Sequence, residues 1–343
     1  MTLAPQSPDS RSGMPRVDVG IPTLGQRAYV HEAIASVLAQ TFTSWRLIVS
    51  VNDVARGEDF SRYDDHPRIE ILRTAEPLGA YGNKNVIARA STAPYLAFLD
   101  DDDLWEPEFL QRRVQALDEH PQCAFAFSTY TEIDAEGRRT SRGPEPFAPA
   151  GVLTQTELLQ ELLAPPSERR IYTIMLTTLV RRSAFEAVGP AFDETLPIIG
   201  DYELWLRLAS RYPAVFLHTW DAAYRRHPGQ DSQRARLGAE FLAVHERLDS
   251  ILGSDLAYLK PGAKELERQR ADWLFSQALD GGGAGARRRA ASAFVAVAGS
   301  SPRYLVDARL PAVLGTVVLG RAMTPVLRPV RSYLRRRSLR KPT

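Results

Sequence analysis

The sequence has very little cysteine: Cys123 is the only one among 343 residues. A single thiol excludes an intramolecular disulfide framework and a zinc site built from several cysteines. Long apolar runs are missing as well, since the longest, residues 310–320, is shorter than the roughly 20 residues that a membrane-spanning helix requires. Residues 1–15 have no apolar segment of the kind found in secretory signals, and we expect a disordered leader there. These absences predict a soluble, cytoplasmic protein.

Two common catalytic motifs are also absent. The sequence contains no G-x-x-x-x-G-K-[ST] phosphate-binding loop and no G-x-S-x-G nucleophile elbow. The glycine-rich segment 281–289 follows a helical pattern instead of a strand, so we interpret it as a flexible link. The sequence therefore supports neither a P-loop nucleotidase nor a serine hydrolase.

Acidic residues are missing from the end of the chain, residues 308–343. This basic tail has nine Lys and Arg residues, so the rest of the chain has 34 basic and 41 acidic side chains, a net charge of −7. An acidic body disfavours nucleic-acid binding, and we expect no nucleic-acid partner. The tail is either a solvated basic end or a peripheral contact with the inner face of a membrane.

Short apolar runs alternate with amphipathic segments in the first third of the chain. The pattern predicts helices over residues 28–41 and 85–91 and from Pro107 onward. The β-rich runs lie at residues 17–22, 46–51, 68–72 and 95–99. Uniformly apolar strands that alternate with helices predict an α/β fold with a mostly parallel sheet covered by helices on both faces. Ligands bind such sheets beyond the carboxyl ends of the strands.

Four consecutive aspartates, residues 100–103, follow the fourth predicted strand. Their mutual repulsion must be relieved by solvent, by a cation or by a helix N-terminus. One interpretation is that one aspartate caps the following helix while the others are solvated. The other is a site for Mg²⁺ or Mn²⁺ that holds a diphosphate, because these hard cations prefer carboxylate oxygens and share their shell with phosphate.

Several segments resemble the inverting family 2 glycosyltransferases of the GT-A fold. The matching segments, in order, are VGIPT, SVLAQTF, WRLIVSVND, LGAYGNKNVIARA, FLDDDDLWEP, TTLVRRSAFEAVGPAFDETL and GDYELWLRLA. The resemblance implies a GT-A type nucleotide-binding fold over residues 16–233. Beyond it, amphipathic patterns predict a helical C-terminal region over residues 234–307, before the basic tail. The resemblance also implies a hexosyltransferase that moves a sugar from a nucleoside-diphosphate sugar, a UDP- or dTDP-sugar, to a hydroxyl acceptor with inversion.

The resemblance assigns roles to individual residues. Asp102 matches the ligand of the divalent metal, Mn²⁺ or Mg²⁺, that bridges the two donor phosphates. His227 completes that metal shell or contacts the phosphates, with which Arg225 or Arg226 can pair. Asp201 matches the catalytic base. The donor nucleotide is expected to contact Pro22, Thr23, Asn52, Asp53, Lys84, Asn85, Asp100 and Asp101.

Some of these roles have alternatives. Lys84 occupies a place where the family commonly has arginine, and the two side chains are not equivalent in bidentate contacts. Asp101 and Asp103 can equally be solvated acids or helix caps. Asp201 lies in the first turn of a predicted helix, residues 200–209, where a negative charge is favoured even without catalysis. Glu203 is the nearby alternative base, although its position is more typical of a residue on one face of that helix.

Two other functions compete with the transferase. A degenerate domain that only binds sugar nucleotides would not need both Asp102 and Asp201. A sugar-nucleotide nucleotidyltransferase would carry a glycine-rich, arginine-containing loop after the first strand, where this chain has PTLGQR. The acceptor is open between a saccharide, a lipid-linked glycan and a small molecule. The amphipathic C-terminal helices can pack on the catalytic domain or form a homo-oligomer.

Overall fold

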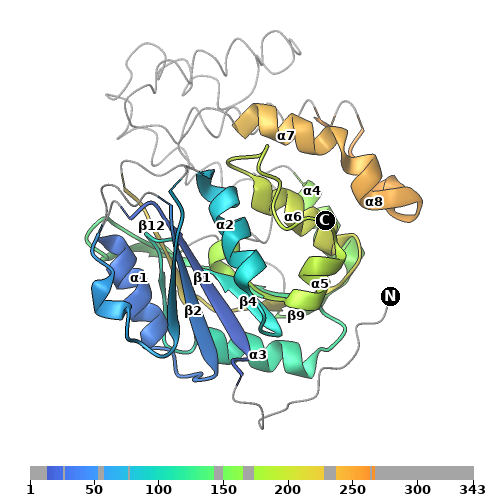
Figure 1. Cartoon of the computed structure of the whole chain (residues 1–343). Coiled ribbons are helices and arrows are strands. Elements are labelled where there is room, and N and C mark those ends of the chain that lie inside the picture. Colours follow the sequence, from blue (N-terminus) through green and yellow to red (C-terminus); the bar gives the residue numbers. More distant parts are fainter. Residues whose placement is uncertain are drawn as a thin grey trace. The chain divides into compact units, whose positions relative to one another are not determined.

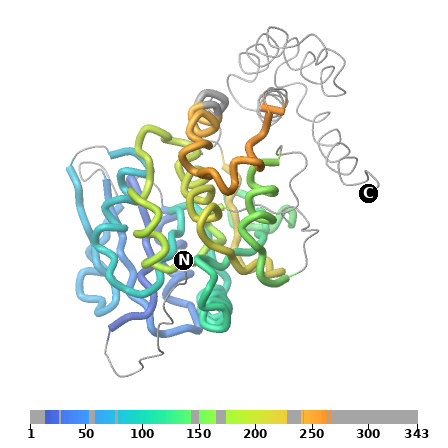
Figure 2. The backbone as a smooth tube through the Cα atoms, turned by 90° about the vertical axis from the view of Figure 1, so that its right-hand side faces the viewer, coloured from blue at the N-terminus to red at the C-terminus, as the bar shows by residue number. Residues whose placement is uncertain are grey.

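The computed structural model describes residues 14–25, 28–52, 58–75, 78–142, 150–164, 174–227, 237–262 and 265–266. Its chain divides into two compact units, residues 1–162 with 170–227, and residues 163–169 with 228–343; Figure 2 traces the described segments in colour. The predicted leader, except residues 14 and 15, and the whole basic tail lie outside the described residues. The predicted domain boundaries therefore stay predictions.

The first unit is built on an eight-stranded sheet with strand order β3-β2-β1-β4-β10-β6-β11-β9 (Figure 1). The strands are β1 (Val17–Thr23), β2 (Trp45–Val51), β3 (Ile69–Arg73), β4 (Tyr95–Phe98), β6 (Phe125–Ser128), β9 (Gly151–Leu153), β10 (Leu179–Arg181) and β11 (Ala214–Leu217). All run in one direction except β9 and β10. The predicted mostly parallel sheet is confirmed, and the sequence analysis did not identify the antiparallel β10.

Helices cover both faces of this sheet. On one face, Val19 of β1 packs in a cluster with Val30 of α1 (Tyr29–Leu38) and Leu110 of α3 (Phe109–Glu119). On the other face lie α2 (Gly79–Ala90), α5 (Arg182–Ala187) and α6 (Gly200–Ala209). The Phe192 ring joins this second layer, because it contacts the rings of Tyr81 of α2, Phe98 of β4 and Phe185 of α5. The predicted two-sided covering is thus confirmed.

The helix α2 begins earlier than the predicted segment 85–91. It starts at Gly79, where φ is +69°, a conformation that glycine adopts without strain. Two glycines in its first turn hide the helical periodicity from a sequence analysis. The helix approaches the sheet closely at Gly20, where a Cβ atom would lie 2.5 Å from a side-chain carbon of Ile87.

A smaller, four-stranded sheet has the order β5-β12-β7-β8. Its strands are β5 (Leu104–Trp105), β7 (Thr131–Ile133), β8 (Arg139–Arg142) and β12 (Ala222–Arg225). Strand β5 follows the four aspartates directly and pairs with β12, which ends two residues before His227. This pairing brings residues that are more than a hundred positions apart in the sequence to one place.

The remaining described helices are short. They are α4 (Gln155–Leu163), α7 (Leu237–Glu246), α8 (Leu248–Leu256) and the 3₁₀ turns Ser61–Tyr63, Met175–Thr177 and Ala257–Leu259. Helices α7 and α8 belong to the second unit and agree with the predicted helical region as far as it is described. Within the described ranges, no helix has the length and apolar character needed to cross a membrane.

Asp18 of β1 is a buried carboxylate that ties the sheet to the turn after α2. It accepts hydrogen bonds from the Arg46 guanidinium at 2.9 and 3.0 Å, the Ser91 hydroxyl at 2.9 Å, and the amides of Thr92 and Ala93 at 2.6 and 2.8 Å. Burial opposes ionisation, but the hydrogen bonds from Arg46 and the two amides together hold the pKa of Asp18 below its usual value. A lowered pKa means that this group stabilises the fold above its unfolded pKa of about 4.

Replacement of Asp18 by asparagine should lower the free energy of unfolding at pH 7 by about 3 kcal/mol, because Arg46 loses its buried partner. The difference from the wild type should shrink as the pH falls below about 4, where the native carboxyl also becomes protonated. Urea denaturation at several pH values measures both effects. Asp134→Asn, which removes a half-exposed carboxylate paired with Arg138, is the matched control. An equal loss in both variants would contradict the prediction.

Candidate active site

The carboxyl ends of β1, β2 and β4 lie at one edge of the sheet because these three strands are parallel neighbours. Pro22 and Thr23 end β1, and both are buried. The Thr23 hydroxyl donates to the Asp101 carboxylate and accepts from the Gly25 amide at 2.8 Å. The predicted donor residues of the first and fourth strands are therefore in contact. Asp53 lies outside the described residues.

Two predicted donor residues, Asn52 and Asn85, have side chains engaged with neighbouring loops. The Asn52 amide donates to the Thr74 hydroxyl at 2.7 Å, and its oxygen accepts from the Leu78 amide at 2.7 Å. The Asn85 amide exchanges hydrogen bonds of 2.9 and 3.0 Å with the Phe192 backbone. Both asparagines thus hold the loops around the edge, and their contact with a nucleotide stays a prediction.

Asp102 and His227 are brought together as predicted, with Asp102 Oδ2 and His227 Nε2 2.8 Å apart. Burial, followed by the charge of Asp100, raises the pKa of Asp102 above its ordinary value, although His227 opposes the shift. In the described part of the chain, no group of three or more His, Cys, Asp or Glu side chains is arranged to hold a metal ion. A carboxylate beside an imidazole nevertheless fits a Mn²⁺ or Mg²⁺ ion that takes its other ligands from phosphate and water.

Lys84 is a buried ammonium among the acidic groups. Its Nζ lies 2.7 Å from Asp100 Oδ1, and only 5% of the residue is exposed. Burial lowers the pKa of Lys84, but the charges of Asp100, Asp201 and Asp102 together have a larger, opposite effect. The pKa of Lys84 is therefore above its ordinary value. The side chain therefore stays charged and offsets part of the repulsion at this edge.

Asp201 lies in the first turn of α6, yet the N-cap of that helix is Ile199. Asp201 Oδ1 accepts hydrogen bonds from the Tyr81 hydroxyl at 3.0 Å and from the Tyr202 amide at 2.8 Å. Burial raises the pKa of Asp201, while the Lys84 charge and the Tyr81 hydroxyl lower it. A half-buried carboxylate with a raised pKa beside a fixed cation has the properties of a general base.

The alternative base, Glu203, is engaged elsewhere. Its carboxylate binds Nε of Arg207 at 2.8 and 2.9 Å, and the Arg207 guanidinium also donates to the backbone carbonyls of residues 188, 190 and 191. Glu203 thus supports the segment that leads into α6. This contact agrees with its interpretation as a helix-face residue.

Arg225 binds the four-aspartate segment through its backbone amide and its side chain, and we call this set of contacts the clamp. Its amide donates to the buried carboxylate of Asp103 at 2.8 Å, and its Nε donates to the Asp102 carbonyl at 2.7 Å. The other nitrogens of its guanidinium bind the Ala135 carbonyl at 3.0 Å and the Glu32 carboxylate at 2.7 Å. The phosphate contact considered for Arg225 thus stays a prediction, and the described contacts give this arginine a supporting place.

Tyr81 and the Asp103–Arg225 contact are parts of the site that the sequence analysis missed. Tyr81 lies three residues before Lys84, so the two side chains share one face of α2. That spacing is the signal by which the tyrosine could have been found. The Asp103 contact joins residues 122 positions apart and left no local signal.

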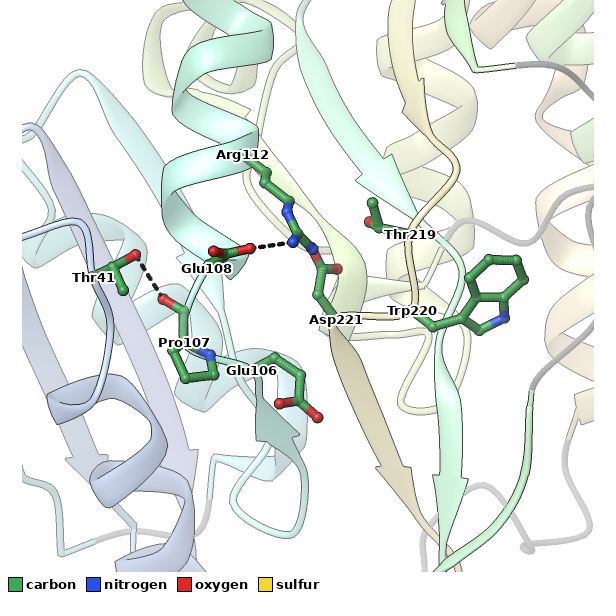
Figure 3. A pocket seen from close by; sticks show the side chains of 8 residues that line it. All are labelled: Thr41, Glu106, Pro107, Glu108, Arg112, Thr219, Trp220 and Asp221. Carbon is green, nitrogen blue, oxygen red and sulfur yellow. Dashed lines mark hydrogen bonds and ion pairs between the residues drawn. The ribbon is translucent and has the colours of Figure 1, made fainter.

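A separate hollow of about 680 Å³ lies at the start of α3 and before β12 (Figure 3). Its lining residues are Thr41, Glu106, Pro107, Glu108, Arg112, Thr219, Trp220 and Asp221. Arg112 pairs there with Glu108 and, at 3.4 Å, with Asp221. None of the predicted site residues lines this hollow, so the candidate active site rests on the side-chain cluster at the sheet edge.

Comparison with known families matches residues 18–186 to the model of glycosyl transferase family 2. The chain contains a family 2 glycosyltransferase domain. The recognised family is thereby confirmed, and the inversion expected from the resemblance is consistent with it.

Two curated relatives are similar to this family 2 domain. A putative teichuronic acid biosynthesis glycosyltransferase of Bacillus subtilis is 29% identical over 129 residues, which cover 36% of this chain and 50% of that protein. An Escherichia coli UDP-Glc:α-D-GlcNAc-diphosphoundecaprenol β-1,3-glucosyltransferase is 26% identical over 119 residues, 34% of this chain and 47% of that protein. The chain thus spans about half the length of these relatives.

Solved structures confirm the GT-A type fold. The crystal structure of Staphylococcus aureus TarS residues 1–349 has a TM-score of 0.54 with 14% identity, covering 89% of this chain and 92% of that one. The same TarS fragment in complex with UDP-GlcNAc has a TM-score of 0.52 with 16% identity and the same coverage. At this identity the likeness concerns the fold alone.

Replacement of the clamp residue Arg225 by lysine should lower the free energy of unfolding by about 2–3 kcal/mol. Lysine keeps the charge but cannot reach Asp102, Ala135 and Glu32 at once. Chemical denaturation measures the loss. The matched control is Arg226→Lys, because the neighbouring Arg226 is partly exposed and pairs with Glu132 on the surface; equal stability of the two variants would contradict the clamp.

Proposed function

We propose that the protein is a metal-dependent glycosyltransferase that moves a sugar from a UDP- or dTDP-sugar to a hydroxyl acceptor with inversion. The observation that carries the proposal is the cluster at the carboxyl edge of the sheet. In it, Asp102 pairs with His227, Lys84 pairs with Asp100, and the charges of both Asp102 and the half-buried Asp201 act on Lys84. Such a transfer requires one group that stabilises the leaving diphosphate and one base that takes the acceptor's proton.

The donor diphosphate would be held between the Asp102–His227 pair and Lys84. A divalent cation, Mn²⁺ or Mg²⁺, would bind Asp102 and His227 and supply positive charge to the departing diphosphate. Lys84 adds a fixed positive charge at the same place. Because the side chain is buried, little solvent screens its attraction to the phosphates. The nucleoside would lie over the ends of β1 and β2, near Thr23 and Asn52. The remaining proposed donor contacts are Pro22, Asp53, Asn85, Asp100 and Asp101.

The choice of a UDP-sugar as the first donor to test has outside support. The E. coli relative is named for a UDP-glucose donor, and the TarS fold neighbour has been crystallised with UDP-GlcNAc and with UDP. The name of the E. coli relative also gives a diphosphoundecaprenol-linked acceptor. A lipid-linked glycan is therefore the acceptor that we propose ahead of a free saccharide or a small molecule.

Asp201 would act as the base. Its raised pKa makes the carboxylate a stronger proton acceptor, while the Lys84 charge and the Tyr81 hydroxyl favour its ionised form. The acceptor oxygen attacks the anomeric carbon as Asp201 takes its proton, and the bonding electrons leave with the diphosphate. With Asp201 as the one base, the acceptor oxygen attacks the anomeric carbon directly, and a single displacement leads to inversion, as the family resemblance also implies.

The donor site is tested by calorimetric titration of UDP, dTDP and GDP with and without Mn²⁺. We expect one nucleotide to bind in the presence of the metal and Asp102→Asn to weaken it at least about tenfold, since a charged contact is lost. The control is Asp118→Asn, which changes a carboxylate on α3 that pairs with Arg16. Absence of binding to every nucleotide would leave a degenerate scaffold as the better function.

The base is tested with Asp201→Asn. We expect release of UDP from UDP-glucose or UDP-GlcNAc to fall about 10²–10⁴-fold, while the affinity for UDP stays within error. Because the pKa of Asp201 is raised, the wild-type rate should fall with decreasing pH already above the ordinary carboxyl value of about 4. Glu203→Gln, two residues away on α6, is the control, and equal rates in the two variants would exclude Asp201 as the base.

A further inference from the structure

Tyr81 of α2 places a buried phenol hydroxyl against the candidate base. The residue is 6% exposed, and its hydroxyl oxygen lies 3.0 Å from Asp201 Oδ1 and 3.1 Å from the carbonyl oxygen of Ile198. The ring stacks on Phe192 with a centroid distance of 5.3 Å. The ring is therefore held in place while the hydroxyl faces two acceptors.

The phenol has one proton and can donate it to only one of these acceptors at a time. Burial and then the Asp201 charge raise the pKa of Tyr81 well above its ordinary value, so the hydroxyl stays protonated. An ionised carboxylate is a stronger acceptor than a backbone carbonyl. The hydroxyl consequently donates to Asp201 when that group is ionised, and Ile198 offers an alternative acceptor when it is not.

The two oxygens of Asp201 have different surroundings. In the described part of the chain, both hydrogen bonds that this carboxylate accepts end on Oδ1, one from the Tyr81 hydroxyl and one from the Tyr202 amide. Two donors occupy the lone pairs of Oδ1 and fix the plane of the carboxylate. Oδ2 is then the oxygen on which a proton from a substrate can be received.

We propose that Tyr81 is a positioning residue for the base: its hydroxyl binds Oδ1 of Asp201, reserves Oδ2 for the acceptor's proton, and turns to the Ile198 carbonyl once Asp201 is protonated. The proposal rests on the proposed function, in which Asp201 is the base. The proton passes from the acceptor hydroxyl to Oδ2, and the acceptor oxygen bonds to the anomeric carbon as the bond to the diphosphate breaks. Tyr81 keeps its own proton throughout and exchanges only its hydrogen-bond partner.

Gly200 provides the room for this contact. A Cβ atom at that position would lie 2.9 Å from two carbons of the Tyr81 ring. Such a distance is too short for a real contact, so any side chain there must displace the ring. Gly200→Ala therefore offers a second way to move the hydroxyl without changing Tyr81 itself.

Three other charged groups influence Asp201 and must be kept constant. Lys84 approaches from α2 and favours the ionised form, whereas Asp100, after β4, disfavours it. On the same helix, Glu203 is already paired with Arg207. Tyr81→Phe removes the hydroxyl and leaves these groups and the ring in place, so a change in the titration of Asp201 can be assigned to that hydrogen bond.

The test is a direct titration of Asp201 by ¹³C NMR in protein labelled at the aspartate carboxyl carbons. The Asp201 signal is assigned by its absence in Asp201→Asn. We expect Tyr81→Phe to raise the pKa of Asp201 by about one unit, because a charge-assisted hydrogen bond to the ionised form is lost. Gly200→Ala should shift it in the same direction. The acid limb of UDP release from UDP-glucose or UDP-GlcNAc should move up by the same amount.

Tyr95→Phe is the matched control. It also removes the hydroxyl of a buried tyrosine, which donates to the Asp118 carboxylate at 2.7 Å. We therefore expect a similar loss of folding stability without any change in the contacts of Asp201. An unchanged pKa of Asp201 in both Tyr81→Phe and Gly200→Ala would overturn the inference even if the enzyme is a glycosyltransferase. Full activity of Asp201→Asn would instead overturn the proposed function, whatever the titration shows.

Discussion

The buried guanidinium of Arg225 is the constraint on which the candidate site depends. It reaches α1 through Glu32 and a contact with the Tyr29 ring, whose centroid lies 4.4 Å away, and it donates to the Asp102 carbonyl. The backbone amide of the same residue donates to the Asp103 carboxylate. Because Arg225 ends β12, the same clamp places His227, two residues later, against Asp102. The Asp102–His227 pair, which we propose as metal ligands, thus joins two residues that are 125 positions apart in the sequence.

The four aspartates are not equivalent, and their repulsion is relieved by four different partners. These pairs are Asp100 with Lys84, Asp101 with Thr23, Asp102 with His227, and Asp103 with the Arg225 amide. Each of the four carboxylates thus has a different partner among these contacts. The helix-cap interpretation of the run is wrong for α3, whose N-cap is Glu108. Burial and the neighbouring acids raise the pKa of Asp103 well above its ordinary value. The interpretation as a divalent metal site that holds a diphosphate stays a prediction.

The sequence predicted the parts of the molecule whose signals are local. The apolar runs predicted strands β1 to β4, and their alternation with helical segments predicted that helices cover both faces of the sheet. The three-residue β10 is too short to show a periodicity, and the glycines at the start of α2 conceal its first turn. Tyr81 looks like an ordinary core aromatic in the sequence, because its hydroxyl meets Asp201 across 120 residues. Asn52 suits a donor contact by residue type, but only the folded chain reveals that its amide is already engaged.

The charge at the sheet edge also bears on the proposed cofactor. Among the described residues, three carboxylates, Asp100, Asp102 and Asp201, face one ammonium, that of Lys84. A donor diphosphate would add further negative charge to a place where burial already raises the pKa of Asp102 and Asp201. A single lysine cannot offset both, and like charges in a partly buried site repel strongly. On the proposed function, a cation held by Asp102 and His227 would supply the positive charge that Lys84 alone lacks, while the Lys84 charge also favours the ionised form of Asp201.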